Sequence, residues 1–431
     1  MPPYLALIIV LSFISCVIYI EHKRAKNQSG AVWIVFLWIL YSESKGLGTF
    51  FNIKTTVEAG SLPDRLFILA LGIISLLILL KRQYSIYTIL KLNGKATVIL
   101  IYMLISILWS KYPAISFRRW GREAIAFIIA SLLCSEKYPI KMLISALKKA
   151  IYSALPLSIL LIKYFPEYGR SYRKLTGEVS WEGIASQKNG LVMICSLSIL
   201  FLCWSLTQDL RNWKTLPSKF PVFIDVFFVM LAFYLMMGPR RTLTYSATSF
   251  FALIVGLIFF IFLKMAIKYG ISIEKKFMLI AIFIISIGIV MPFSGKIPIK
   301  ALPKLLNRNE TLTGRTEIWN SLIPYANQNL LLGHGFGGFW TTALRNEIAS
   351  HAHNGYLNTI LNLGLCGLLL FIIFILDFIK KSFKLLRSES QIAFFSLSLI
   401  LVLIIRNISE VSLGEFSTYS TWLLLSLSFI Y

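Results

Sequence analysis

Two histidines stand close together in the C-terminal third of the chain, directly before a long apolar run. His351 and His353 open the sequence SHAHNGYLNTILNLGLCGL. Imidazole has a pKa near 6.5, so it can take a proton from a hydroxyl group around neutral pH. His353 is therefore a candidate general base; the alternative is a capping or interfacial residue. For His351, and for His334 in a glycine-rich turn, the structural interpretation is favoured. Asn354 can cap the helix that follows and orient the ring.

Arginines are the candidates for binding an anion. Arg315, in the sequence LTGRTEIWNSLI, could hold a phosphate or carboxylate through two parallel hydrogen bonds, which lysine cannot form. The alternative for Arg315 is a surface ion pair with Glu317. Glu410, in the sequence RNISE, could orient an acceptor group or neutralise Arg406, and the sequence leaves both roles open.

The chain that carries these residues has the composition of a membrane protein. Hydrophobic residues make up 57% of 431 positions, and the mean hydropathy is +0.74. Apolar runs long enough to cross a hydrocarbon core of about 30 Å recur along the whole chain, so the expected fold is all-α and polytopic, with about 12 transmembrane helices. The first run is expected to be a retained helix, since basic residues follow it instead of preceding it. The five cysteines show no disulfide or metal spacing. The apolar runs lie at 4–20, 31–46, 65–80, 96–109, 123–134, 143–162, 190–206, 220–237, 248–263, 277–293, 355–378, 391–409 and 419–431.

The basic loops predict how the chain is oriented in the membrane. Loops at 21–26, 81–82, 275–278 and 380–387 fall on one side by alternation, which makes that side cytoplasmic. Most lysines lie on this side, whereas most arginines lie on the other. The arginine distribution predicts an anionic substrate on the outer face; an error in the helix count is the alternative. The net charge of +24 is divided between both faces and does not imply nucleic-acid binding.

The same alternation places the polar segments on the outer face. A site assembled from several helix ends needs such segments, whereas simple connections do not. The chain is therefore divided into transmembrane helices over 1–293, a large extracytoplasmic loop over 294–352, and C-terminal transmembrane helices over 353–431. Within the loop, GRTEIWNSLIPYANQ predicts a helix with Thr313 near its N-cap, forming a helical cap over the membrane domain. The polar segments are 109–123, 171–190, 237–249, 294–352 and 406–410.

An ordered series of motifs resembles the O-antigen ligase/polymerase (Wzy and WaaL) superfamily, in particular its exopolysaccharide-polymerase branch. The series runs WS with nearby RRW, WEGIASQKNGL, TYSATS, LTGRTEIWNSLI, LLGHGFGGFW, HAHNGYLNTILNLGLCGL and RNISE. The resemblance implies a GT-C-type, inverting glycosyltransferase in the bacterial inner membrane, with its site on the periplasmic face. The implied donor is a glycan on undecaprenyl pyrophosphate, and no cofactor or metal is expected.

The resemblance also implies roles for particular residues. Arg315 would hold the lipid pyrophosphate. The family usually has a second basic residue where this chain has Ala247, so Arg241, or else Arg240 or Lys188, is expected to supply that contact. The expected catalytic base is His353, and the expected substrate-binding residues are Asn189, Arg240, Asn354 and Glu410.

The acceptor separates the remaining hypotheses. A polymerase would extend another lipid-linked repeat unit, whereas an O-antigen ligase would use the lipid A core. The exopolysaccharide-like sequence WEGIASQKNGL favours a polymerase. Relatives that glycosylate proteins are a third alternative. The expected partners are the lipid-linked glycan, the acceptor, the lipid bilayer and a chain-length regulator. A lipid-linked oligosaccharide flippase is the remote alternative, because no internal repeat is visible and the motifs cluster on one face.

Overall fold

The protein is described by a computed structural model that covers the chain except residues 26–27, 52, 54–59, 173–176, 215, 217, 240–245, 295–313 and 389. Nearly all described elements are helices, joined by one short hairpin of two strands. The predicted all-α, polytopic membrane fold is confirmed. The chain forms two compact units: unit 1 comprises Met1–Ile53 and Leu132–Ile258, and unit 2 comprises Lys54–Ser131 and Phe259–Tyr431.

Eight of the described helices are long and apolar enough to cross a membrane, or nine if α5 (Ile86–Leu92) and the bent segment Gly94–Trp109 form one span. Helices suit these runs because hydrocarbon offers no hydrogen-bond partners. The backbone N–H and carbonyl groups must therefore bond to one another, as they do within a helix. The shorter apolar helices are α2 (Ala31–Glu43), α18 (Ile392–Arg406) and α19 (Tyr419–Ile430). Each predicted run falls on a helix, but the predicted total of about 12 spans is not confirmed.

Unit 1 is built on α8, most of whose residues are buried, and which packs against α1, α2 and α11. Inside the unit, Lys148 Nζ lies 2.6 Å from Asp225 Oδ2, and Arg24 Nη2 lies 2.6 Å from Asp209 Oδ1. The elements are α1 (Pro3–Arg24), α2, α3 (Leu47–Phe50), η2 (Leu132–Ser135), α8 (Pro139–Tyr164), α9 (Pro166–Gly169), β1 (Arg170–Tyr172), antiparallel β2 (Val179–Trp181) with Arg170 opposite Trp181, α10 (Lys188–Arg211), α11 (Phe220–Met237) and the first part of α12 (Ala247–Lys268).

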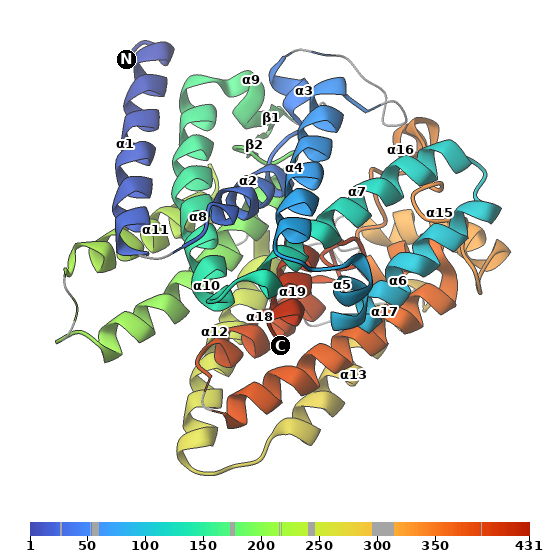
Figure 1. Cartoon of the computed structure of the whole chain (residues 1–431). Helices are drawn as coiled ribbons and strands as arrows, with labels where there is room; N and C mark the ends of the chain where they lie inside the picture. The colour runs from blue at the N-terminus through green and yellow to red at the C-terminus, as the bar shows by residue number, and fades with distance from the viewer. Residues whose placement is uncertain are drawn as a thin grey trace. The chain divides into compact units, whose positions relative to one another are not determined.

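Unit 2 gathers the C-terminal helices around α17, which packs against α6, α13, α15 and α18. Figure 1 shows α13 and α17 running side by side. The predicted helix over GRTEIWNSLIPYANQ is confirmed as α15, which packs on α13 and α17; Thr313 lies outside the described residues. The elements are α4 (Leu62–Lys81), α5, α6 (Gly94–Ile105), η1 (Ser106–Trp109), α7 (Pro113–Ser131), the rest of α12, α13 (Glu274–Phe293), α15 (Arg315–Gln328), α16 (Thr342–Glu347), α17 (Gly355–Arg387), α18 and α19.

These compact units cut the chain differently from the predicted division at 293 and 352. That division follows the membrane boundary, whereas the units follow packing, so the two descriptions answer different questions. The predicted division stays a prediction. Unit 2 contains both α15 from the predicted loop and α17 from the predicted C-terminal part, and it therefore holds the main candidate residues within one body.

Candidate functional site

The histidine loop, residues 350–354, is held in place by the side chain that caps α17. Asn354 Oδ1 accepts a hydrogen bond from the Leu357 N–H at 2.8 Å, which confirms the predicted cap. Asn354 Nδ2 donates to the carbonyl oxygens of Gly288 at 2.9 Å and Ile408 at 3.0 Å. Asn354 is fully buried, so its amide fixes the loop between α13 and the segment after α18. Its predicted contact with substrate stays a prediction.

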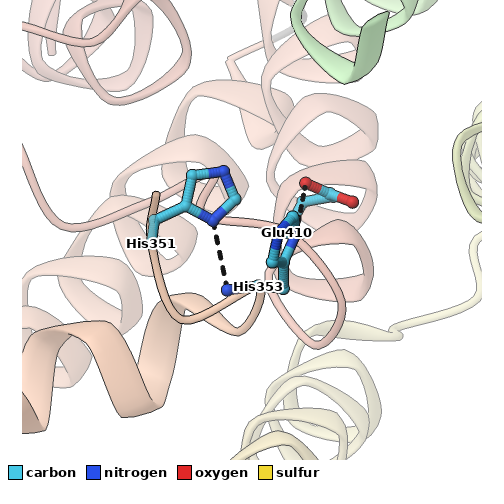
Figure 2. A group of neighbouring side chains, drawn as sticks. All are labelled: His351, His353 and Glu410. Atoms are coloured by element: carbon cyan, nitrogen blue, oxygen red, sulfur yellow. Dashed lines mark hydrogen bonds and ion pairs between the residues drawn. The ribbon is translucent and has the colours of Figure 1, made fainter. Parts of the chain in front are cut away.

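His353 has an unusual backbone conformation. Its φ angle of 48° lies in the left-handed region, which non-glycine residues rarely adopt. Its N–H donates to Nδ1 of His351 at 3.2 Å, and the two ring centroids lie 4.1 Å apart. Figure 2 shows the histidines together with the side chain of Glu410. Strain of this kind persists only where the surroundings impose it, and it is concentrated at functional sites.

Glu410 connects the histidine loop to Arg315. Its Oε1 accepts a hydrogen bond from Arg315 Nη2 at 2.5 Å, and its Oε2 lies 3.7 Å from His353 Nδ1. The second distance is too long for a hydrogen bond, so this contact is electrostatic. Among the described residues, His353 Nδ1 is buried and has no hydrogen-bond partner. One carboxylate thus faces both the predicted base and the predicted anion-binding residue.

Asn407 shapes the segment that presents Glu410. Its Oδ1 accepts hydrogen bonds from the N–H groups of Ser412 at 3.0 Å and Leu413 at 2.8 Å. Its backbone carbonyl accepts from the Gly355 N–H at 2.8 Å, at the start of α17. Because Asn407 is buried, these bonds fix the turn after α18 against the helix that carries the histidine loop.

Arg315 is the first residue of α15, and only 7% of it is exposed. One turn later, Trp319 donates from Nε1 to the carbonyl of Ala352 at 2.9 Å, which ties α15 to the histidine loop. A surface ion pair with Glu317 does not fit this arrangement, because Arg315 is buried and bonded to Glu410. Within the described part of the chain, Arg315 Nη1 has no hydrogen-bond partner.

Positive charge dominates the electrostatics of this site. Burial alone would raise the pKa of Glu410, but the contacts with His353 and Arg315 outweigh burial and lower it to about 2. Burial lowers the pKa of His351 to about 4, and the charges of His353, Arg345 and Arg315 act in the same direction. At neutral pH, Glu410 is therefore ionised and His351 is neutral.

The site contains the ligand types of a metal centre. The ligand atoms of His351, His353 and Glu410 lie within 4.8 Å of one another, a set that could in principle suit Zn²⁺. However, Glu410 is already bonded to Arg315, and the buried Arg406 is near enough for its charge to act on both. A divalent cation would face these guanidinium groups, whereas an anion would be attracted by them. The charges favour an anionic ligand.

Other predicted site residues lie elsewhere in the chain. Lys188 and Asn189 begin α10 in unit 1, and Ala247 is the buried first residue of α12. Arg240 and Arg241 lie outside the described residues. The roles predicted for these residues remain predictions. The structure brings together Arg315, His353, Asn354 and Glu410.

Sequence reasoning missed part of this cluster. It left open whether Glu410 orients an acceptor sugar or neutralises Arg406. It did not pair Glu410 with Arg315 or His353. It also did not single out Arg345, which lies on α16 and acts electrostatically on the histidine loop. The available signal for Glu410 was an acidic residue at the end of an apolar run. By contrast, His334 Nε2 lies 2.9 Å from the Tyr325 carbonyl, which fits the favoured structural role.

Comparison with known proteins shows what the chain is similar to. Residues 232–372 match the sequence profile of a protein family described as O-antigen ligase. The chain is also 22% identical over 307 residues to the exopolysaccharide production protein ExoQ of Rhizobium meliloti (strain 1021). The resemblance to the O-antigen ligase/polymerase superfamily is confirmed. The match to ExoQ covers 68% of this chain and 65% of that relative, which is less than two thirds of its length. No solved structure shows a significant match.

The superfamily match covers only part of the site. Arg315, His353 and Asn354 lie inside the matched region 232–372, whereas Glu410 lies beyond its end. The structure brings Glu410 to the other residues through the turn that follows α18.

Proposed function

We propose that this protein is a membrane glycosyltransferase that polymerises undecaprenyl-pyrophosphate-linked repeat units into a surface polysaccharide. The observation that carries the proposal is the contact of Glu410 with both Arg315 and His353. A cation for a departing pyrophosphate and a base for an acceptor hydroxyl are the two groups this transfer needs. The superfamily match and the similarity to an exopolysaccharide production protein support the same reaction class.

In the proposed reaction, the acceptor hydroxyl oxygen attacks the anomeric carbon of the donor sugar, and His353 Nε2 takes the hydroxyl proton. The bond between that carbon and the phosphate oxygen breaks, and its electron pair leaves with undecaprenyl pyrophosphate. Attack opposite the leaving group inverts the anomeric centre. Glu410 Oε2, at 3.7 Å from Nδ1, stabilises the imidazolium that forms, as a buried carboxylate does in hydrolase triads.

Arg315 is assigned to the leaving group. Its Nη2 is fixed by Glu410 at 2.5 Å, while its Nη1 has no hydrogen-bond partner among the described residues. A guanidinium oriented in this way before the reaction costs no reorganisation when negative charge develops on the pyrophosphate. The nearby charges of Arg345 and Arg406 add to the positive potential. The proposed setting is the periplasmic face of the inner membrane, and the reaction needs no metal.

Ligation to the lipid A core is the second candidate function. It is favoured by one specific observation, the description of the matching family as O-antigen ligase. Both reactions use the same donor chemistry, so the site residues keep their roles. The difference lies in the acceptor that reaches His353.

The test is a transfer assay with the purified full chain in liposomes that contain lipid-linked repeat units, run in the presence of EDTA. A polymerase gives a ladder of extended lipid-linked chains on a gel, whereas a ligase gives transfer only when lipid A core is added. His353→Ala is expected to lower the rate by about 10²–10⁴-fold, the usual contribution of a general base. His22→Gln, at an exposed position on α1, is the matched control and should keep the rate. Ladders of wild-type intensity from His353→Ala would refute the base assignment.

A further inference from the structure

The longest helix of unit 2, α17, is broken at Gly364, directly before its most apolar stretch. α17 is long and apolar enough to cross a membrane, yet Gly364 within it has φ 67° and ψ −169°, which no helical residue adopts. A break at this place deprives N–H and carbonyl groups of their helical partners. In hydrocarbon, such groups are tolerated only when other parts of the protein satisfy them.

A short loop from outside the span satisfies these groups. We call residues 329–334, between α15 and the glycine-rich turn, the leucine loop. The N–H of Leu365 donates to the carbonyl of Leu330 at 2.9 Å, and the N–H of Cys366 donates to the carbonyl of Leu331 at 3.1 Å. The leucine loop therefore supplies the acceptors that the second half of α17 lacks.

A third backbone hydrogen bond has its donor on the leucine loop and its acceptor on α17. The N–H of His334 donates to the carbonyl of Leu361 at 3.0 Å. The backbones approach so closely that a Cβ at Gly333 would lie 2.5 Å from the nitrogen of Gly364, and a Cβ at Gly364 would lie 2.2 Å from the oxygen of Leu331. Both glycines have positive φ. The contact between loop and helix thus requires glycine on each side.

A second apolar segment contacts both the leucine loop and α17. Trp109 Nε1 on η1 donates to the carbonyl of Leu332 at 3.3 Å, and Tyr102 OH on α6 donates to the carbonyl of Leu363 at 3.0 Å. Trp and Tyr with polar tips of this kind are enriched where protein meets the membrane interface. The leucine loop is therefore fixed against two apolar segments that suit a membrane.

The side chains of the leucine loop are exposed although they are apolar. Leu330, Leu331 and Leu332 are 36%, 66% and 47% exposed. On α17, directly after the break, Leu365 is 36% exposed and Leu369 is 58% exposed. The loop thus continues the exposed apolar surface of a helix whose outward side chains meet lipid.

We propose that the leucine loop is re-entrant and that its leucines lie among the acyl chains of the bilayer. The occupant is lipid, because the loop is bonded to α17 at the start of its apolar stretch and shares its exposed apolar surface. An extramembrane loop with adjacent leucines in water would leave an apolar patch without a partner. This inference goes beyond the proposed transfer reaction and does not depend on it.

The test places a spin label on the leucine loop. Leu331→Cys is made in the full chain with its native cysteines replaced by alanine, labelled with a nitroxide and reconstituted into liposomes. Collision with oxygen, which concentrates in hydrocarbon, is compared with collision with a water-soluble nickel chelate. Leu369→Cys on α17 is the control for lipid, and Asn346→Cys, at an exposed position on α16, is the control for water.

The oxygen-to-nickel ratio at position 331 is expected to equal that at 369 and to exceed that at 346 several-fold. A ratio at 331 equal to that at 346 would place the leucine loop in water and overturn the proposal. An immobilised label that neither reagent reaches would also overturn it, since another protein or a second copy would then cover the loop. Leu332→Cys repeats the measurement if the first variant does not elute as folded protein.

Discussion

The two units of the molecule each contain a buried cluster of charged side chains, but the clusters differ in how their charges are used. In unit 1, both oxygens of Asp225 are engaged, one by Lys148 Nζ at 2.6 Å and the other by the hydroxyl of Tyr152. In unit 2, Arg315 Nη1 and His353 Nδ1 are buried without hydrogen-bond partners among the described residues. The carboxylate of Asp225 has both oxygens engaged and holds helices together, whereas Nη1 of Arg315 is available to a ligand.

The first prediction tests the structural half of this comparison. Lys148→Met leaves the carboxylate of Asp225 buried without its cation, because both residues are almost fully buried. Breaking a buried ion pair on one side typically costs about 3–5 kcal/mol. We expect a large fall in thermal stability in nanodiscs, followed by tryptophan fluorescence or by aggregation on heating.

The matched control removes both charges together. Replacing a buried ion pair with apolar residues of similar size is often neutral, so the double variant Lys148→Met, Asp225→Leu is expected to regain stability and to keep transfer activity. If this double variant folds stably but no longer transfers glycan, the unit 1 cluster has a functional role and the contrast between the units fails.

The second prediction tests the functional half of the comparison. Arg315→Lys keeps the positive charge but loses the planar fork, so it cannot bind Glu410 and a phosphate together. Loss of a preorganised donor to a developing anion typically lowers the rate by about 10²–10³-fold. We expect a loss of this size in the liposome assay, with little change in thermal stability. The matched control is Arg387→Lys on the exposed end of α17, and wild-type activity in Arg315→Lys would show that only charge is used.

The membrane helices and the local motifs could be predicted from the sequence. Long apolar runs form helices wherever lipid denies other hydrogen bonds, and the Asn354 cap is a short-range signal that the structure confirms. The run predicted at 123–134 belongs to a helix that already begins at Pro113. Its first part carries arginines, so hydropathy detects only the apolar end.

The contacts that build the site could not be predicted in the same way. Arg315 and Glu410 are 95 positions apart. No local sequence pattern predicts that the turn after α18 contacts the start of α15. The break at Gly364 was hidden as well, because glycine is common in membrane helices and the residues on both sides of Gly364 fit a single helix. Both features depend on which backbone lies nearby, and only the packing of unit 2 determines that.

The third prediction uses the neutral histidine of unit 2 and has the smallest expected effect. The pKa of His351 is lowered by burial to about 4 from its ordinary value of 6.5, so the unfolded chain binds more protons than the folded chain between these values. The free energy of unfolding must therefore fall as the pH falls from 6.5 toward 4. At pH 5 it is about 2 kcal/mol lower than above pH 7. His351→Asn keeps an acceptor for the His353 N–H but does not titrate, so its thermal stability should be less sensitive to pH between 6.5 and 5.

Glu410 does not confuse this measurement. Its pKa is lowered to about 2 from 4.5, so its stabilising contribution is present above pH 4.5 and is lost only below that value. The comparison of wild type with His351→Asn at pH 5 and pH 7 therefore isolates the histidine. Equal pH sensitivity of the two proteins would mean that folding does not lower the pKa of His351. The contrast between the two clusters would then rest on the contacts of Arg315.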